Sequence, residues 1–280
     1  MIQKVPNIFQ TRTNHEYPPY NKMVFEEYFM NWFIENKIES ERVYLPIMWT
    51  NFYISRKYGT VGMCDLQMCL DTLDRSKKYF TVIQYDDGIL QDLKDLDIQI
   101  FGAGGGGKRT VSERNLGQPS PLLCQPNPFI DKKKERNLIC SFAGTIKNHP
   151  IRQQIKNLYF NKFLVLDSVG YSQYIDIMER SVFSLCPRGY GATSFRICES
   201  LQHGSIPVYV YDKPWIPFED DFDFNKIGIL ISEKQIPDIL DIIKSKTKEE
   251  IAEYVENGKA IYEQYFTFEG CAKKIIEKLC

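Results

Sequence analysis

Several features that mark other protein classes are missing from this sequence. Its 280 residues contain no run of about 20 apolar side chains, the length that a membrane span needs. Residues 1–21 lack the apolar core of a signal peptide. The formal net charge is only -1, so no overall basic field favours nucleic acid or an anionic membrane. We therefore expect a soluble, cytoplasmic protein that has no nucleic-acid partner.

Residues that bind metals or form disulfides are sparse or badly spaced. The chain has three histidines and eight cysteines, and the cysteines are scattered along it. Several cysteines lie in apolar runs, as in LICSFAG and FSLCPRG, and Cys64 and Cys69 are too far apart for a C-x-x-C site. We expect reduced, mostly buried thiols of an intracellular protein, and no zinc site.

The apolar content is high enough for a large folded core. Hydrophobic residues make up 43% of the chain and aromatic residues 14%, enough for one large domain or two modest ones. The charged stretch DKKKER, residues 131–136, is the predicted domain boundary. We expect an N-terminal domain over residues 1–135, a C-terminal domain over 136–265 and a final helix over 266–280.

The first part of the chain alternates irregularly between predicted helices and strands. Apolar side chains recur at helical spacing over residues 22–37, which predicts a helix there. The other predicted elements are an extended segment over 42–54 that runs into a loop, a strand over 78–88 ending in the turn Asp86-Asp87-Gly88, a strand over 98–102, and a short strand broken by prolines over 121–129.

Beyond residue 136 strands and helices alternate regularly. Strands are expected over 137–144, 163–167, 182–189, 206–212 and 228–232, and helices over 149–159, 171–181 and 193–204. Gly204 should cap the last of these helices, and T-K-E-E over 247–250 offers a capping box for a helix through Tyr265. This alternation predicts an α/β fold, with a parallel sheet covered by helices on both faces.

The stretch FGAGGGGKRT, residues 101–110, contains G-x-G-x-x-G and most of G-x-x-x-x-G-K-[ST]. A dinucleotide fingerprint lies between the first strand and the first helix of a βαβ unit, whereas these glycines follow a third strand. Arg109 stands where a phosphate-binding loop has the Ser or Thr that meets magnesium. We interpret the stretch as a mobile loop, or as a flap from which Lys108 or Arg109 reaches an anionic substrate.

The segment SVFSLCPRGYGATSFRICESLQHGSIPV, residues 181–208, carries the strongest functional pattern. A strand delivers Arg188 to the carboxyl edge of the sheet, where ligands of open α/β sheets bind. The helix that begins near Ser194 suits a phosphate through its N–H groups and dipole, and Arg188 and Arg196 can donate to the same anion. Glu199 can accept hydrogen bonds from two vicinal hydroxyls of a ribose. Together these residues predict a nucleoside diphosphate site.

Each of these residues also has a purely structural interpretation. Ser194 can serve only as a helix N-cap, and Arg196 and Glu199, three residues apart, can form a surface ion pair. We favour the binding site because an arginine at the preceding strand end converges with them on one turn.

These residues resemble a known family. P-R-G-x-G-x-x-S-x-R-x-x-E over 187–199, G-x-I-P-V over 204–208 and the D-x-x-x-x-P-F segment that begins at Asp212 are similar to the exostosin family, glycosyltransferase family 47. CSFAGTIKNHPIR over 140–152 resembles its F-x-G…I-R segment, and QYDDG over 84–88 resembles its H-D-W-G strand end. The resemblance is specific in the second half of the chain and loose in the first. The chain also resembles a xylosyltransferase of large algal DNA viruses.

The resemblance implies a GT-B fold, in which two Rossmann-like domains face a cleft, with a final helix that crosses back to the first domain. It implies inverting transfer of a sugar, best assigned as xylose, from a UDP-sugar to an acceptor glycan, and no metal or cofactor is expected. The donor-binding residues would come from two segments: Gly144, Thr145, Lys147, Arg152, Arg188, Gly189, Tyr190, Thr193, Ser194, Arg196 and Glu199.

An acceptor hydroxyl that attacks a sugar must lose its proton, so a base is needed. Asp86 and Asp87 end a strand of the first domain; the residues themselves slightly favour Asp87, whereas the family match favours Asp86, and both can also be plain turn residues. Further candidates are His15 as base, and Tyr17, Tyr20 and Trp49 as stacking surfaces for acceptor sugars, with core packing the alternative for Trp49.

Two other classes of function stay open at this point. One is a carbohydrate-binding protein without catalysis on the same fold, and the other is a nucleotide-sugar-modifying or phosphorylase-type enzyme. The substitution Arg188→Ala separates the first from an enzyme, because only an enzyme should lose both transfer and diphosphate binding. Donor sugar, acceptor, linkage and oligomeric state do not follow from the sequence.

Overall fold

The computed structural model describes residues 1–13, 24–124, 127–130 and 134–279. The chain divides into two compact units, one of Met1–Pro126 with Phe268–Cys280 and the other of Asn127–Thr267. The final helix therefore belongs to the first unit, as expected. The first division falls at residue 126 rather than in the charged stretch after residue 130.

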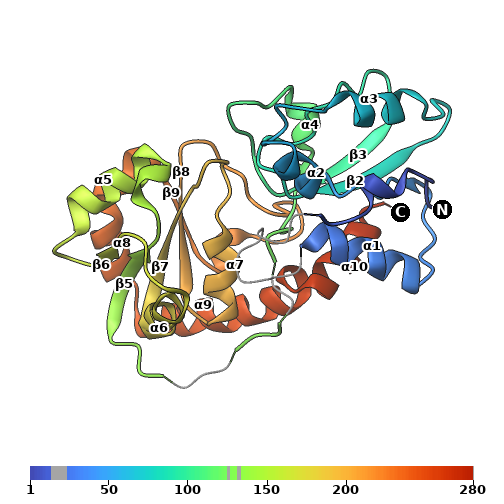
Figure 1. Ribbon diagram of the computed structural model, residues 1–280. Coiled ribbons are helices and arrows are strands. Elements are labelled where there is room, and N and C mark those ends of the chain that lie inside the picture. Colours follow the sequence, from blue (N-terminus) through green and yellow to red (C-terminus); the bar gives the residue numbers. More distant parts are fainter. Residues whose placement is uncertain (14–23, 125–126, 131–133, 280) are drawn as a thin grey trace. The chain divides into compact units, whose positions relative to one another are not determined.

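The first unit contains a parallel sheet of strand order β1-β2-β3-β4 (Figure 1). Its elements are η1 (Asn7–Phe9), α1 (Phe25–Glu35), β1 (Val43–Tyr44), α2 (Trp49–Ser55), α3 (Cys64–Asp71), β2 (Tyr79–Ile83), β3 (Ile98–Gly102), α4 (Glu113–Leu116), β4 (Gln118–Pro119) and, from the end of the chain, α10 (Phe268–Glu277).

Aromatic side chains attach α1 to this sheet. Phe29 and Phe33 lie one helical turn apart and meet Tyr44 of β1 with ring centroids 5.3 and 5.0 Å away. Phe25 contacts Phe268 of α10 at 5.6 Å, which holds the end of the chain in this unit. Each such pair adds about 0.5 to 1.5 kcal/mol beyond the burial of its surface.

Two predictions for the first unit were wrong. The segment over 42–54 was expected to be extended, but β1 ends at Tyr44 and α2 begins at Trp49. Trp49, Phe52 and Tyr53 follow the i, i+3, i+4 spacing of a helix face and are buried, which decides for a helix. The strand expected over 121–129 is also not present in its described residues, and the short β4 precedes it.

The second unit shows the regular alternation that its sequence predicts. Its elements are β5 (Leu138–Ala143), η2 (Ile146–Asn148), α5 (Pro150–Tyr159), β6 (Leu164–Leu166), α6 (Tyr171–Arg180), β7 (Ser181–Pro187), α7 (Phe195–Gln202), β8 (Ile206–Tyr211), η3 (Phe224–Lys226), β9 (Ile229–Ser232), η4 (Glu233–Asp238), α8 (Ile239–Lys244), α9 (Lys248–Ile261) and the π-helical turn η5 (Tyr262–Phe266). Gly204 follows α7 with φ +65°, and Thr247 caps α9 in a capping box with Glu250.

The second sheet is parallel and has the strand order β6-β5-β7-β8-β9. Figure 1 shows α5 and α8 on one face of it and α6 and α7 on the other. The chain moves from β5 to one neighbour, β6, and then crosses to the other neighbour, β7. Such a reversal leaves a crevice outside the carboxyl ends of the two central strands, where open α/β sheets bind ligands. The α/β class with two Rossmann-like units is therefore confirmed.

Candidate functional site

The residues after β5 and β7 meet at this reversal point. Gly144 and Thr145 follow β5, Arg188 follows β7, and Arg152 and Arg196 reach the same place from α5 and α7. Parallel strands end at one edge of a sheet, so residues about 40 positions apart in the chain become neighbours there. The predicted donor segments are thus brought together.

Arg196 is buried, with 9% of its surface exposed, as is Arg152 with 8%. Its guanidinium lies 4.6 Å from the ring centroid of Phe142 and donates through Nη2 to the carbonyl of Ala143. Its Nε finds no hydrogen-bond partner among the described residues. A buried donor without a partner costs about 1 to 3 kcal/mol, and this cost is removed when an acceptor arrives.

Gly144 has a role here that the sequence prediction did not include. A Cβ at this position would lie 2.6 Å from Nη2 of Arg196, and the residue has φ +156°. The missing side chain lets the guanidinium approach the end of β5. Glycine is therefore explained by the approach of Arg196 and not only by an approach of the backbone to a nucleotide.

Arg152 ties the two strand ends together. Its Nε donates to the carbonyl of Arg188 at 2.8 Å, its Nη1 to Thr145 at 3.1 Å and its Nη2 to Pro187 at 3.3 Å. Burial, followed by the nearby charge of Arg196, lowers the pKa of Arg152 to about 10. A guanidinium with this pKa remains charged at neutral pH, so the site holds two buried cations next to each other.

Arg188 is held by an acidic partner at the end of β8. Its Nη1 lies 2.6 Å from Oδ1 of Asp212, and its Nη2 donates to the carbonyl of Tyr190 at 2.8 Å. On the other side of the carboxylate, His149 Nε2 is 3.7 Å from Asp212 Oδ2, while its Nδ1 accepts from Ile151 N and caps α5. Because Nδ1 is an acceptor, the proton of neutral His149 is on Nε2, next to Asp212.

The predicted nucleotide site needs an acceptor for the ribose hydroxyls, and Glu199, half-buried in α7, is the residue predicted for this role. Its Oε2 accepts a hydrogen bond of 2.5 Å from the hydroxyl of Tyr174 in α6. The alternative interpretation was a surface ion pair of Glu199 with Arg196, but the Arg196 guanidinium is buried and donates to the carbonyl of Ala143.

The turn between β7 and α7 supplies backbone groups. Gly189 N donates to Thr193 O at 3.3 Å and closes the turn. Ser194 is the N-cap residue of α7, but its side chain makes no capping hydrogen bond. Tyr190 and Lys147 are exposed at the rim, and Thr193 is half-buried. α7 begins at Phe195, directly after this turn, and a helix start that follows Arg188 in the chain is an arrangement that suits an anion.

The predicted bases occupy the end of β2 in the first unit. Asp87 is buried, with 1% of its surface exposed, and its Oδ1 accepts from the backbone N of Arg109 at 3.1 Å. Asp86 is half-buried. Asp87 thus contacts the glycine loop, and the choice between Asp86 and Asp87 as the base stays a prediction.

The glycine loop packs on this turn. A Cβ on Gly104 would overlap the backbone of Asp86, and Gly106 N donates to Asp86 O at 2.9 Å. The glycines are explained by this close approach of two backbones. A role of Lys108 or Arg109 toward an anionic substrate stays a prediction.

The remaining acceptor-side predictions have mixed outcomes. Trp49 is completely buried and its Nε1 donates to Thr81 at 2.8 Å, so it belongs to the core and cannot stack on a sugar. His15, Tyr17 and Tyr20 lie outside the described residues.

Acidic residues in metal-binding spacing have other partners. The sequence contains two D-x-D tripeptides, 95–97 and 221–223. Asp97 lies 2.7 Å from Arg42, and Asp223 accepts from Asn225 N at 2.9 Å. Over the described part of the chain, no three His, Cys, Asp or Glu side chains are grouped to hold a metal ion. That no metal is required stays a prediction.

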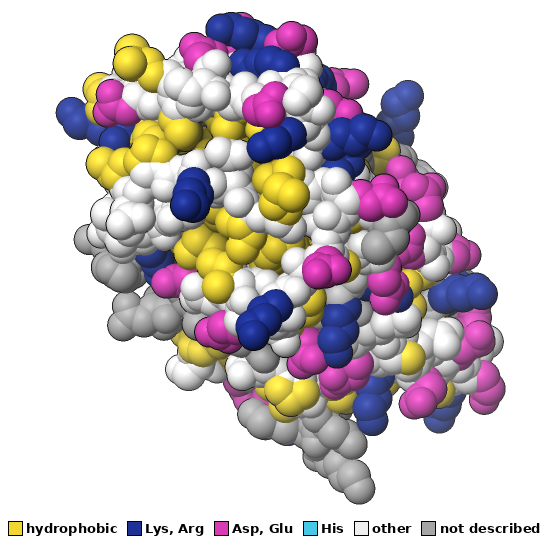
Figure 2. Space-filling view, turned by 90° about the vertical axis from the view of Figure 1, so that its right-hand side faces the viewer, with side chains coloured by type: hydrophobic (Ala, Val, Ile, Leu, Met, Phe, Trp, Pro, Cys, Tyr) yellow, Lys and Arg dark blue, Asp and Glu magenta, His cyan; other side chains and the backbone are white. Residues whose placement is uncertain are grey.

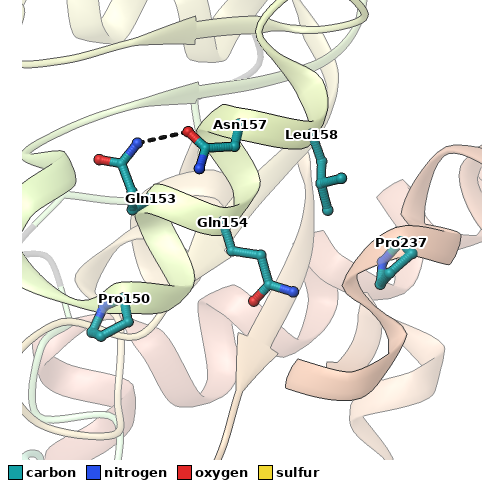
Figure 3. A pocket seen from close by; sticks show the side chains of 6 residues that line it. All are labelled: Pro150, Gln153, Gln154, Asn157, Leu158 and Pro237. Atoms are coloured by element: carbon teal, nitrogen blue, oxygen red, sulfur yellow. Dashed lines mark hydrogen bonds between the residues drawn. The ribbon is translucent and has the colours of Figure 1, made fainter.

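A hollow elsewhere in the second unit does not suit a diphosphate. It lies between α5 and η4, where Gln154 and Leu158 point toward Pro237 (Figure 3). None of its six lining residues is charged: Pro150, Gln153, Gln154, Asn157, Leu158 and Pro237. The arginine cluster is the better anion site.

On the face shown in Figure 2, basic and acidic side chains are interspersed with hydrophobic ones. None of the described helices combines the length and apolar character that crossing a membrane requires.

Two Rossmann-like units and an arginine cluster at a sheet reversal are typical of proteins that bind phosphorylated ligands at the carboxyl edge of a sheet. Residues 119–246 match a family described as "Exostosin GT47 domain". This match covers the whole arginine cluster. This part of the chain is therefore similar to the exostosin domain of glycosyltransferase family 47, the family that its motifs resemble.

Curated relatives share this region. An exostosin-1 homolog of Caenorhabditis elegans is 30% identical over 93 residues, which is 33% of this chain and 24% of the relative. The probable beta-1,4-xylosyltransferase IRX10 of Arabidopsis thaliana is 36% identical over 72 residues, which is 26% of this chain and 18% of the relative. The matched segments thus span about a quarter of these relatives or less. They do not test the resemblance to viral enzymes.

Among solved structures, AviGT4, a glycosyltransferase of avilamycin A biosynthesis, has a TM-score of 0.47 at 10% identity and covers 91% of this chain and 87% of its own. TarM has a TM-score of 0.45 at 10% identity and covers 88% of this chain and 56% of its own.

Sequence reasoning missed three residues of the cluster. Asp212 appeared only as part of the family pattern, and His149 and Tyr174 did not appear as site residues. The residue before Pro150 is a reasonable N-cap position, which is a weak signal for His149. Tyr174 has no local signal, because its partner Glu199 belongs to another helix.

Proposed function

We propose that this protein is a glycosyltransferase that moves a sugar from a nucleoside diphosphate to a hydroxyl of an acceptor glycan. The observation that carries the proposal is the convergence of Arg152, Arg188 and Arg196 at the reversal between β5 and β7, next to the start of α7. A diphosphate carries the charge and the oxygens that such a cluster lacks.

The arrangement explains how the leaving group is stabilised. Negative charge develops on the diphosphate as the bond from its terminal phosphate oxygen to the sugar carbon breaks. Arg188 and Arg196 neutralise this charge, and the first N–H groups of α7 add to the effect. Glu199 accepts from the ribose hydroxyls. The guanidiniums are held by backbone carbonyls, so little reorganisation is needed when the charge appears.

The finer assignments follow the family resemblance. The donor is a UDP-sugar, with xylose as the best candidate; one relative is named as a probable xylosyltransferase and others as probable glucuronosyltransferases. The reaction inverts the sugar carbon without a metal. Asp86, in the first unit, accepts the proton of the attacking hydroxyl, and this unit binds the acceptor.

Nucleotide binding to the purified chain tests the proposal. Thermal shift and calorimetry with UDP, GDP and TDP should show binding of one nucleotide class by the wild type. Arg188→Ala should weaken that binding about 10- to 100-fold, because it removes a charge-assisted contact and leaves Asp212 facing the phosphates. Arg180→Ala is the matched control, because Arg180 pairs with Asp176 on the exposed face of α6.

Three outcomes separate the candidate functions. Loss of nucleotide binding and of sugar transfer in Arg188→Ala, with both kept in Arg180→Ala, supports the proposal. Glycan binding without any nucleotide binding would indicate a carbohydrate-binding protein and overturn it. Nucleotide-sugar turnover that ignores every acceptor but consumes phosphate would indicate a phosphorylase-type enzyme.

A further inference from the structure

Tyr174 is the residue of this cluster for which the diphosphate contacts give no role. It lies in α6, on the face of the sheet that α7 also covers, and its hydroxyl donates to Glu199 Oε2 at 2.5 Å. Its ring faces the guanidinium of Arg196, which lies 5.4 Å from the ring centroid. One side chain thus contacts both the cation and the carboxylate of the predicted donor site.

The chemistry of this contact keeps Tyr174 a donor. Burial raises the pKa of its hydroxyl well above the usual value, Arg196 opposes this, and the negative charge of Glu199 adds to it. The hydroxyl therefore stays protonated at neutral pH. A short O–H···O⁻ bond to a carboxylate is among the stronger hydrogen bonds in proteins.

This bond restricts the Glu199 side chain. A free glutamate loses rotamer entropy when it is immobilised, and a carboxylate that is already held does not lose it on binding. Holding Oε2 also sets the direction in which the carboxylate presents its lone pairs. The Tyr174 ring also faces the guanidinium of Arg196. A phosphate that binds near Arg196 therefore acts on the side chain that orients the Glu199 carboxylate.

We propose that Tyr174 is a positioning residue that orients the Glu199 carboxylate toward the vicinal hydroxyls of a ribose, and so makes the site selective for ribonucleotides over 2′-deoxyribonucleotides. This inference rests on the proposed function. It assigns selectivity for the nucleotide sugar ring to a residue that does not itself touch the phosphates.

The test compares UDP with 2′-deoxy-UDP by calorimetry on the full chain. Wild type should prefer UDP by about tenfold or more, because the deoxy ligand leaves the carboxylate without one donor. Tyr174→Phe should reduce this preference at least about threefold through weaker UDP binding, with little change for 2′-deoxy-UDP. Glu199→Gln should also reduce the preference for UDP, because it changes the acceptor of the same hydrogen bond.

Tyr159→Phe is the control, because the Tyr159 hydroxyl also makes a buried 2.5 Å hydrogen bond, to the carbonyl of Ile236. It should lower the melting temperature and keep the preference of the wild type. If folded Tyr174→Phe keeps the full preference for UDP, Tyr174 is only structural and the inference is wrong. If wild type binds neither nucleotide, the proposed function itself fails, which is a different result.

Discussion

The close approach of Arg196 to Gly144 makes Gly144→Ala the most informative single change. The new Cβ would lie 2.6 Å from Nη2 of Arg196, whereas ordinary contacts begin near 3.4 Å. Arg196 must therefore move by roughly 1 Å, which breaks its hydrogen bond to Ala143. The φ of +156° adds backbone strain of about 1 to 3 kcal/mol for any residue other than glycine.

The expected loss of binding follows from this displacement. A hydrogen bond to a charged group contributes about 1.5 to 3 kcal/mol, which corresponds to roughly 10- to 150-fold in the dissociation constant. We expect UDP to bind Gly144→Ala more weakly by a factor in this range. The fold should persist, because the new atom meets the end of a side chain and not a second backbone.

Calorimetric titration of UDP and a thermal melt measure the two effects separately. Gly170→Ala is the matched control, because Gly170 has negative φ and a Cβ there would meet nothing within 4 Å. The control should bind UDP as the wild type does. If folded Gly144→Ala binds UDP with unchanged affinity, Arg196 does not contact the phosphates and the site is wrongly placed.

Two further predictions concern the first unit. Burial raises the pKa of Glu26 from 4.5 to about 7, although the hydrogen bonds from Thr50 and Gln84 act in the opposite direction. The contribution of Glu26 to the stability of the fold is therefore full below pH 4.5 and is lost as the pH rises through 7. Between pH 5 and pH 8 the unfolding free energy of the wild type, measured by urea titration, should fall by about 2 to 3 kcal/mol more than that of Glu26→Gln. Parallel pH curves for both proteins would contradict this. Gly104→Ala should overlap the backbone of Asp86, lower the melting temperature and speed proteolysis within residues 101–110, and an unchanged melt would show that the loop does not pack on this turn.

Local patterns in the sequence were sufficient for the second unit. Its strands and helices alternate with clear caps, and Gly204 and Thr247 stand where the helices end and begin. Arg188 and Arg196 are eight residues apart across one strand–turn–helix unit. Such a short connection leaves few arrangements, so their place at the sheet edge could be predicted from the chain alone.

The first unit needed the tertiary structure. The run around Trp49 and Phe52 is apolar enough for either a strand or a helix, and burial against the sheet decided for α2. The glycine loop looks like a phosphate site in sequence. Its glycines are required because the Asp86 turn packs against them.

The sequence by itself thus determined the alternating fold of the second unit, the resemblance of its central part to the exostosin domain and the two arginines of the turn. Only the tertiary structure decided what surrounds them: Gly144 beside Arg196, and Tyr174 on Glu199. The physical reason is that hydrophobic period and capping are local, whereas these contacts depend on which strands become neighbours when the chain reverses direction in the sheet.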